Sequence, residues 1–167
     1  MGTQSTNATR EAEALPVRLV RGAVGGLLAG AAFIAINMWF VASMGDPAVA
    51  PFELISTIVL GAGAIEAGTA SVPLGIAVHA VLSILFGVVF ALAAPMFKSN
   101  GTVALAGGAF GALLYLVNFL LIAQTVLPQF QMPNQPLELA VHLVFGHLLA
   151  VFFYSSGVRR GERFLAF

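Results

Sequence analysis

Four apolar stretches, each about as long as a membrane-spanning helix, limit what this chain can fold into. They cover approximately residues 17–41, 73–94, 103–123 and 137–158. A helix needs about 20 apolar residues to cross the hydrocarbon core of a bilayer. Only 8% of the 167 residues are charged and 59% are hydrophobic, whereas an average soluble domain is about 25% charged. The sequence therefore predicts an all-α integral membrane protein with four transmembrane helices.

The basic residues indicate how such a protein is oriented. All seven lie before or at the start of the first stretch, between the second and third, or after the fourth: Arg10, Arg18, Arg21, Lys98, Arg159, Arg160 and Arg163. The two connections on the other side carry no basic residue, and the acidic residues there and at the adjoining helix start are Asp46, Glu53, Glu66 and Glu138. Cytoplasmic loops are enriched in Lys and Arg. We therefore expect a multi-pass protein with both termini in the cytoplasm.

Composition also sets the domain boundaries and excludes some functions. Residues 1–16 are expected to form a disordered cytoplasmic tail, residues 17–158 the transmembrane domain, and residues 159–167 a basic cytoplasmic tail. The formal net charge is zero, which argues against nucleic acid as a partner because phosphate binding needs a basic face. The chain has no cysteine, which excludes thiol catalysis, disulfide bonds and thiolate metal sites.

The second half of the chain resembles the first. Residues 73–79 (PLGIAVH) and 136–142 (PLELAVH) are identical at five of seven positions. In the preceding stretches, Gly26, Gly30 and Asn37 correspond to Gly107, Gly111 and Asn118. We therefore predict two tandem related hairpins, residues 17–96 and 101–158. Because each holds two spans, both hairpins have the same orientation in the membrane.

The connection inside the first hairpin is longer than its counterpart by 18 residues, since the matching positions are 81 residues apart in one helix and 63 in the next. Residues 51–60 open with a proline suited to a first helical turn. They are too few to span a bilayer, so we predict a short external helix at the membrane interface. Residues 61–71 are expected to be flexible. Residues 124–136 are expected to be extended and ordered by contact with a neighbouring segment.

Small residues one helical turn apart predict close helix packing. Such a spacing lets another helix approach closely, and van der Waals contact drives association in lipid. The interpretation we favour is packing inside the bundle, and the alternative is that one such face binds another subunit. The residues concerned are Gly22, Gly26 and Gly30 in the first stretch and Gly107 and Gly111 in the third.

Two histidines occupy matching positions in the repeated segments and define the candidate site. His79 and His142 each lie six residues after the proline that opens their stretch, at about the depth of Asn37 and Asn118. Glu138 lies four residues before His142 and shares its helix face, where it can accept a proton from the imidazole. Ionisable groups in a span usually face the bundle interior or an aqueous cavity.

Four uses of these side chains remain open. The one we favour is a polar contact that fixes the packing of the two hairpins. Alternatively, His79 and His142 bind a haem b between facing helices, or they hold a divalent metal together with Glu138. The fourth is a ligand or transport site at the level of Asn37 and Asn118. His147 lies about 140° around the helix from His142, so both cannot point at one centre.

The chain resembles a loose family of small four-helix bacterial inner-membrane proteins. The resemblance rests on a glycine-rich first helix ending in Asn37-Met38-Trp39, the external 51–60 helix, Ala77-Val78-His79 and His142-Leu143-Val144-Phe145-Gly146. It covers residues 18–158, implies a location in the bacterial inner membrane, and implies no catalytic residue.

The sequence contains no Walker loop, Gly-x-Ser-x-Gly, His-Glu-x-x-His or dinucleotide fingerprint. We therefore predict a non-catalytic protein with no cofactor, which acts as an accessory or structural subunit of a larger membrane complex. Its expected partners are membrane lipid and other membrane subunits or a second copy. The two alternatives are an electron-transfer protein using His79 and His142, and a small dimeric transporter or channel.

Overall fold

The structure is a computed structural model that describes residues 13–154, and every regular element among them is helical. Three continuous helical stretches are long and apolar enough to cross a membrane: Leu15–Ser43, Val72–Met96 and Asn100–Thr125. The last helix, Gln135–Val151, is apolar but has 17 residues. The α-helices are α1 (Leu15–Ser43), α2 (Ala50–Leu60), α3 (Val72–Ala93), α4 (Asn100–Tyr115), α5 (Ala123–Thr125) and α6 (Gln135–Val151).

Three of the helices have an N-cap residue whose side chain accepts a hydrogen bond from a backbone N–H group of the first turn. The Ser71 hydroxyl accepts from the backbone N–H of Leu74 at the start of α3. Ser99 and Thr102 form a reciprocal capping box at the start of α4. The Asn134 side chain caps α6. These caps place the helix starts within three residues of the predicted ones.

Two expected boundaries differ from the observed ones. Helix α1 begins at Leu15, so the last residues of the expected 1–16 tail are helical. Helix α6 ends at Val151, and residues 152–154 form a turn. The predicted end at residue 158 lies outside the described residues, as do residues 1–12 and the basic 159–167 segment.

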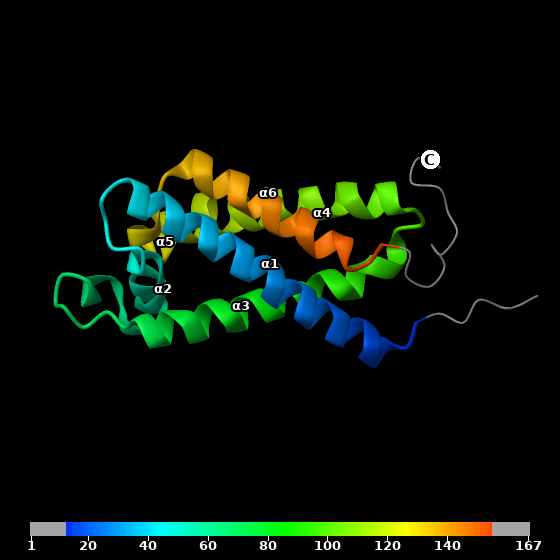
Figure 1. The fold of residues 1–167 in the computed structure, drawn as a ribbon, viewed down its shortest axis with the longest axis horizontal. Coiled ribbons are helices and arrows are strands. Elements are labelled where there is room, and N and C mark those ends of the chain that lie inside the picture. The colour runs from blue at the N-terminus through cyan, green and yellow to red at the C-terminus, as the bar shows by residue number, and fades with distance from the viewer. Residues whose placement is uncertain (1–12, 155–167) are drawn as a thin grey trace, which may run out of the picture.

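The long helices pack as two antiparallel pairs (Figure 1). Helix α1 runs along α3, α4 runs along α6, and the pairs meet where α1 contacts α6. The start of α1, the α3–α4 connection and the end of α6 lie at one end of the bundle, whereas α2 and α5 lie at the other. Arg18, Arg21 and Lys98 therefore sit at the first end, which we call the basic end, and Asp46, Glu53 and Glu66 sit at the opposite, acidic end.

Both pairs are held together where glycines let the two backbones touch. A Cβ atom added to Gly87 of α3 would collide with the Gly22 carbonyl and the Gly26 Cα of α1. A Cβ atom added to Gly146 of α6 would collide in the same way with Gly107 and Gly111 of α4. The glycines that the sequence assigns to helix packing thus lie between helices of this chain. Gly30 adds a third contact, against Ser83 of α3.

An aromatic cluster fills the centre of the bundle near the basic end. Phe90 of α3 is 2% exposed and lies against Phe97, Phe110 and Phe153 at centroid distances of 6.4, 5.4 and 5.5 Å. Because these rings come from both helix pairs and from the α3–α4 connection, the cluster joins the two pairs into one core.

Helix α4 continues into a π-helical segment, Leu116–Ile122, before α5. The N–H of Ala123 bonds to the carbonyl of Asn118, five residues earlier. Such segments are rare and often occur at functional sites. The apolar pattern of the sequence does not reveal this departure from α-helix, because every residue type in the segment except Asn118 is equally apolar.

A short helix, α2, is present where the sequence predicts one, and it packs on α3. Gly75 makes this approach possible, since a Cβ there would collide with the backbone of Phe52. The Ser71 N–H donates to the Ser56 hydroxyl at 3.0 Å, which ties the start of α3 to α2.

The two remaining connections contain more regular structure than expected. Residues 61–71, expected to be flexible, contain a 3₁₀ turn at Ala62–Ala64. The backbone N–H groups of Thr69 and Ala70 both donate to the carbonyl of Ala64, which closes the loop that follows this turn. Residues 124–136 contact a neighbour as expected, but they include a 3₁₀ turn, Pro128–Gln131, and are not fully extended. The contact is a hydrogen bond from Gln129 Nε2 to Thr57 Oγ1 of α2, at 2.9 Å.

Replacing Thr57 with valine is expected to loosen this connection. Thr57 is fully buried, and the Gln129 side-chain oxygen already has no partner. Valine would leave the Gln129 amide nitrogen without its acceptor as well, which costs about 1–3 kcal/mol. We expect the amide protons of residues 126–131 to exchange about tenfold faster or more in deuterium-exchange mass spectrometry.

Thr125→Val is the matched control. The Thr125 hydroxyl is exposed and donates only to the nearby Leu121 carbonyl, at 2.8 Å. Equal acceleration in both variants would mean that the contact with α2 does not order this connection.

Candidate functional site

A cavity of about 570 Å³ opens between the two helix pairs toward the acidic end. Its walls come from α1, α2, α3, the π-helical segment, the 126–134 connection and α6. Most of the lining is apolar, and it includes the rings of Phe33, Phe40, Phe86, Phe119, Phe130 and Phe145. Its polar lining residues are Asn37, Asp46, His79, Ser83, Asn118, Asn134, Glu138 and His142. An apolar chamber with a few polar groups is typical of a small-molecule site.

The two repeated histidines both line this cavity, and the ring of Phe33 packs against both. The Phe33 centroid lies 5.9 Å from that of His79 and 4.9 Å from that of His142. The sequence places the histidines at matching depth. It does not reveal that one aromatic ring from α1 contacts both.

His79 connects α3 to α1. Its Nε2 lies 2.9 Å from the carbonyl oxygen of Gly30. Because a carbonyl can only accept, this nitrogen carries the proton, and Nδ1 keeps its lone pair. The glycine itself is required here, since a Cβ on Gly30 would press on Ser83 and on the imidazole. This contact lies within the first helix pair, so it does not join the two predicted hairpins as the favoured interpretation expects.

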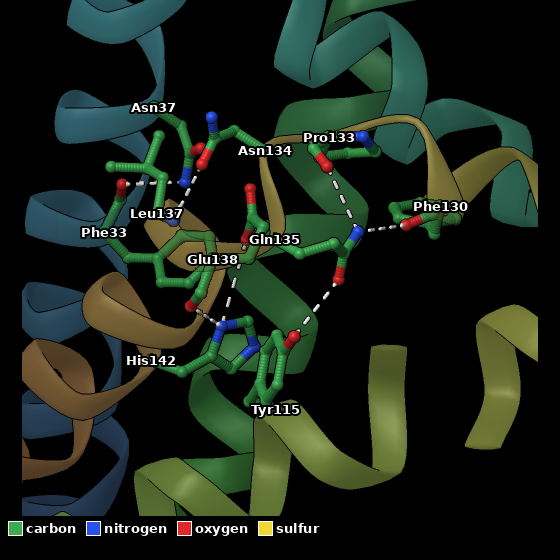
Figure 2. Close-up of polar contacts among 10 residues, drawn as sticks. All are labelled: Phe33, Asn37, Tyr115, Phe130, Pro133, Asn134, Gln135, Leu137, Glu138 and His142. Carbon is green, nitrogen blue, oxygen red and sulfur yellow. Dashed lines mark hydrogen bonds and ion pairs between the residues drawn. The ribbon is translucent and has the colours of Figure 1, made fainter. Parts of the chain in front are cut away.

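His142 bonds within its own helix (Figure 2). Its Nδ1 lies 2.7 Å from the backbone carbonyl of Glu138 and 3.9 Å from a carboxyl oxygen of the same residue. Glu138 is thus close to the imidazole, as the spacing predicts, but the hydrogen bond goes to its main chain. The Nε2 of His142 keeps its lone pair, and the ring meets Phe119 and Tyr115 at steep angles, edge to face.

The repeated asparagines also reach the cavity. Asn37 is 7% exposed, and its Nδ2 donates to the Phe33 carbonyl at 3.4 Å. Asn118 lies in the π-helical segment and also lines the cavity. Tyr115 is buried, and its hydroxyl donates a hydrogen bond to Gln135 Oε1 at 3.3 Å. A buried tyrosine hydroxyl usually has such a partner.

The haem and metal alternatives gain no support from this arrangement. One nitrogen of each imidazole lies at hydrogen-bond distance from a backbone carbonyl, and the ring of Phe33 contacts both imidazoles. Among residues 13–154, no group of three or more His, Cys, Asp or Glu side chains is placed to hold a metal ion. His79, His142 and Glu138 share one cavity but do not form a ligand set.

His147 lies on the outside of the bundle, away from the cavity. Its Nδ1 lies 2.8 Å from the Leu143 carbonyl, and its ring covers Gly108 of α4, where an added Cβ would lie 2.7 Å from Cε1. The helical spacing predicts this divergence from His142. The cavity, Phe33 and Ser83 are the features that sequence reasoning missed, because nothing in an apolar span distinguishes a cavity-lining residue from a lipid-facing one.

These features together describe a helical protein with candidate membrane-spanning helices and an apolar, partly polar-lined cavity. The chain matches no known protein family, no curated protein and no solved structure in comparisons with all three. The cavity is therefore the feature from which a function can be inferred.

Proposed function

We propose that this chain is a non-catalytic bacterial inner-membrane protein that binds a small, largely apolar molecule in the cavity between its helix pairs. The observation that carries the proposal is the cavity itself: about 570 Å³, walled mainly by aromatic and aliphatic side chains. Ligand pockets are commonly about 300–1,000 Å³ and mostly apolar, with a few polar groups that fix orientation. A carrier or a ligand-binding subunit would both use such a site.

The proposed topology has four spans, with α6 as the fourth and both termini in the cytoplasm. A span needs about 17–25 residues, and the 17 residues of α6 reach the lower limit. The end of the bundle with Arg18, Arg21 and Lys98 is then cytoplasmic. The cavity opens toward the external side.

We also propose that the two helix pairs arose by duplication. The two pairs have matching glycine contacts, which supports this proposal. In the first pair the backbone of Gly87 lies against Gly22 and Gly26. In the second pair the backbone of Gly146 lies against Gly107 and Gly111. All five of the glycines singled out in the sequence are engaged within the chain. We further propose that the chain associates with other membrane subunits, and this association would use other surfaces.

Filling the cavity tests the proposed function. Leu54 of α2 lines the cavity, and Val59 of the same helix is 62% exposed and does not. We expect Leu54→Trp to abolish binding of triphenylphosphine oxide, a neutral aromatic probe, and Val59→Trp to leave it unchanged. Binding is measured by equilibrium dialysis on protein in lipid nanodiscs, with uptake by protein-free nanodiscs subtracted.

Two results would contradict the proposed function. One is no saturable binding of the probe by the wild-type protein, together with no small molecule retained when the protein is extracted from its membranes and analysed by native mass spectrometry. The other is equal binding by the wild-type protein and Leu54→Trp.

A further inference from the structure

The carboxyl group of Glu138 is a buried acidic group in the cavity wall. Glu138 is 5% exposed and lines the cavity. Among the described residues, no hydrogen bond reaches its carboxyl oxygens, and the nearest polar group is His142 Nδ1 at 3.9 Å. That nitrogen already donates to the Glu138 main chain. A buried carboxylate in apolar surroundings is costly unless an opposite charge or hydrogen bonds compensate it.

The cavity wall supplies no such charge. None of its lining residues is a lysine or arginine, and its other ionisable acid is Asp46. The arginines among the described residues lie at the opposite end of the bundle, where Arg21 pairs with Glu13 at 2.5 Å and donates to the Phe152 carbonyl at 3.5 Å. The cavity wall thus offers an ionised Glu138 no lysine or arginine as a counter-charge, and a cation that enters the cavity would supply one.

The rest of the wall suits a cation with an apolar body. Phe33 and Phe119 lie beside His142, one turn from Glu138, and four more phenylalanines line the cavity. Ring faces attract cations, more strongly once water is excluded. The free lone pairs on His79 Nδ1 and His142 Nε2 add two acceptors and no positive charge while the imidazoles are neutral.

We propose that the ligand is a lipophilic organic cation, whose charge lies against Glu138 and whose apolar body fills the aromatic part of the cavity. This inference rests on the proposed function and adds the charge class of the ligand.

The test compares three probes of similar shape and different charge in the same nanodisc assay: tetraphenylphosphonium, triphenylphosphine oxide and tetraphenylborate. The wild-type protein is expected to bind the cation more tightly than the neutral oxide and to bind the anion least. Glu138→Gln removes the charge that faces the cation and is expected to raise the Kd for tetraphenylphosphonium by more than about tenfold, as truncating one partner of a buried charge pair does. It should leave the Kd for the oxide unchanged.

Glu66→Gln is the matched control. It removes one negative charge at the same end of the bundle, and Glu66 is exposed and does not line the cavity. It is expected to leave all three affinities unchanged.

The inference is overturned if the wild-type protein binds the three probes equally, or if Glu138→Gln weakens the cation and the oxide alike. The proposed function would still stand in that case if the wild-type protein binds triphenylphosphine oxide and Leu54→Trp abolishes this binding. Failure of every probe to bind, together with no small molecule retained on extraction, would contradict the proposed function as well. The wild-type comparison needs no variant, so the inference stays testable even if Glu138→Gln does not fold.

Discussion

Replacing Gly87 with leucine is expected to separate α1 from α3 and to lower the free energy of unfolding by about 3 kcal/mol, the upper part of the usual range for overpacking. The cost is high because the atoms in the way belong to the backbone of α1, at Gly22 and Gly26. A flexible side chain could rotate aside, but a helix backbone can only move as a whole. The measurement is thermal unfolding of the purified protein in detergent, followed by circular dichroism.

Gly63→Leu separates this effect from the general cost of a larger residue. A Cβ atom added to Gly63 would meet no other atom within 4 Å, and the residue has no positive φ angle. The Gly63→Leu variant should unfold at nearly the same temperature as the wild-type protein. If the two leucine variants unfold alike, the glycine contact between α1 and α3 does not hold the pair together.

Truncating Phe90 to alanine is the second substitution with a large expected effect. Phe90 of the first helix pair is 2% exposed and contacts two rings of the second pair, Phe110 in α4 and Phe153 just after α6. Phe→Ala in a core costs about 3–5 kcal/mol. We expect about 3 kcal/mol, because helices that have come apart in lipid or detergent still have apolar surroundings, so less of the transfer energy is lost. Thermal unfolding in detergent measures this loss too.

Leu92→Ala is the control on the same helix. Leu92 is 55% exposed on the surface of the bundle, where lipid or detergent replaces the lost contacts. It is expected to change stability by less than about 0.5 kcal/mol. A comparable loss in Leu92→Ala would mean that the aromatic cluster contributes no more than the outer surface.

The position of each helix along the chain is predictable from the sequence because it depends on hydropathy and on local signals. The apolar stretches locate the long helices, and Pro51 marks the start of α2. Ser99 and Asn134 supply the caps of α4 and α6. These features act over a few residues, so the sequence contains them directly.

The composition of the site is only partly predictable, because it depends on how each helix is rotated about its axis. His79, His142, Asn37 and Asn118 are expected at one depth, and all four line the cavity. The sequence cannot predict that Phe33 contacts both imidazoles, because periodicity does not fix the rotation of a helix that is apolar on every side. Long-range contacts such as Gln129 to Thr57 have no local signal at all.

The π-helical segment Leu116–Ile122 has a consequence for how this chain can change in length. A π turn holds about one residue more than an α turn. A deletion of one residue within the segment can therefore be absorbed by its return to regular α-helix, with the flanking α4 and α5 keeping their facing. A deletion within α1 or α3 would instead rotate everything beyond it by about 100° and carry Gly22 or Gly87 off the contact between them. Among the described helices, shortening is tolerated best beside Asn118, at the cavity wall.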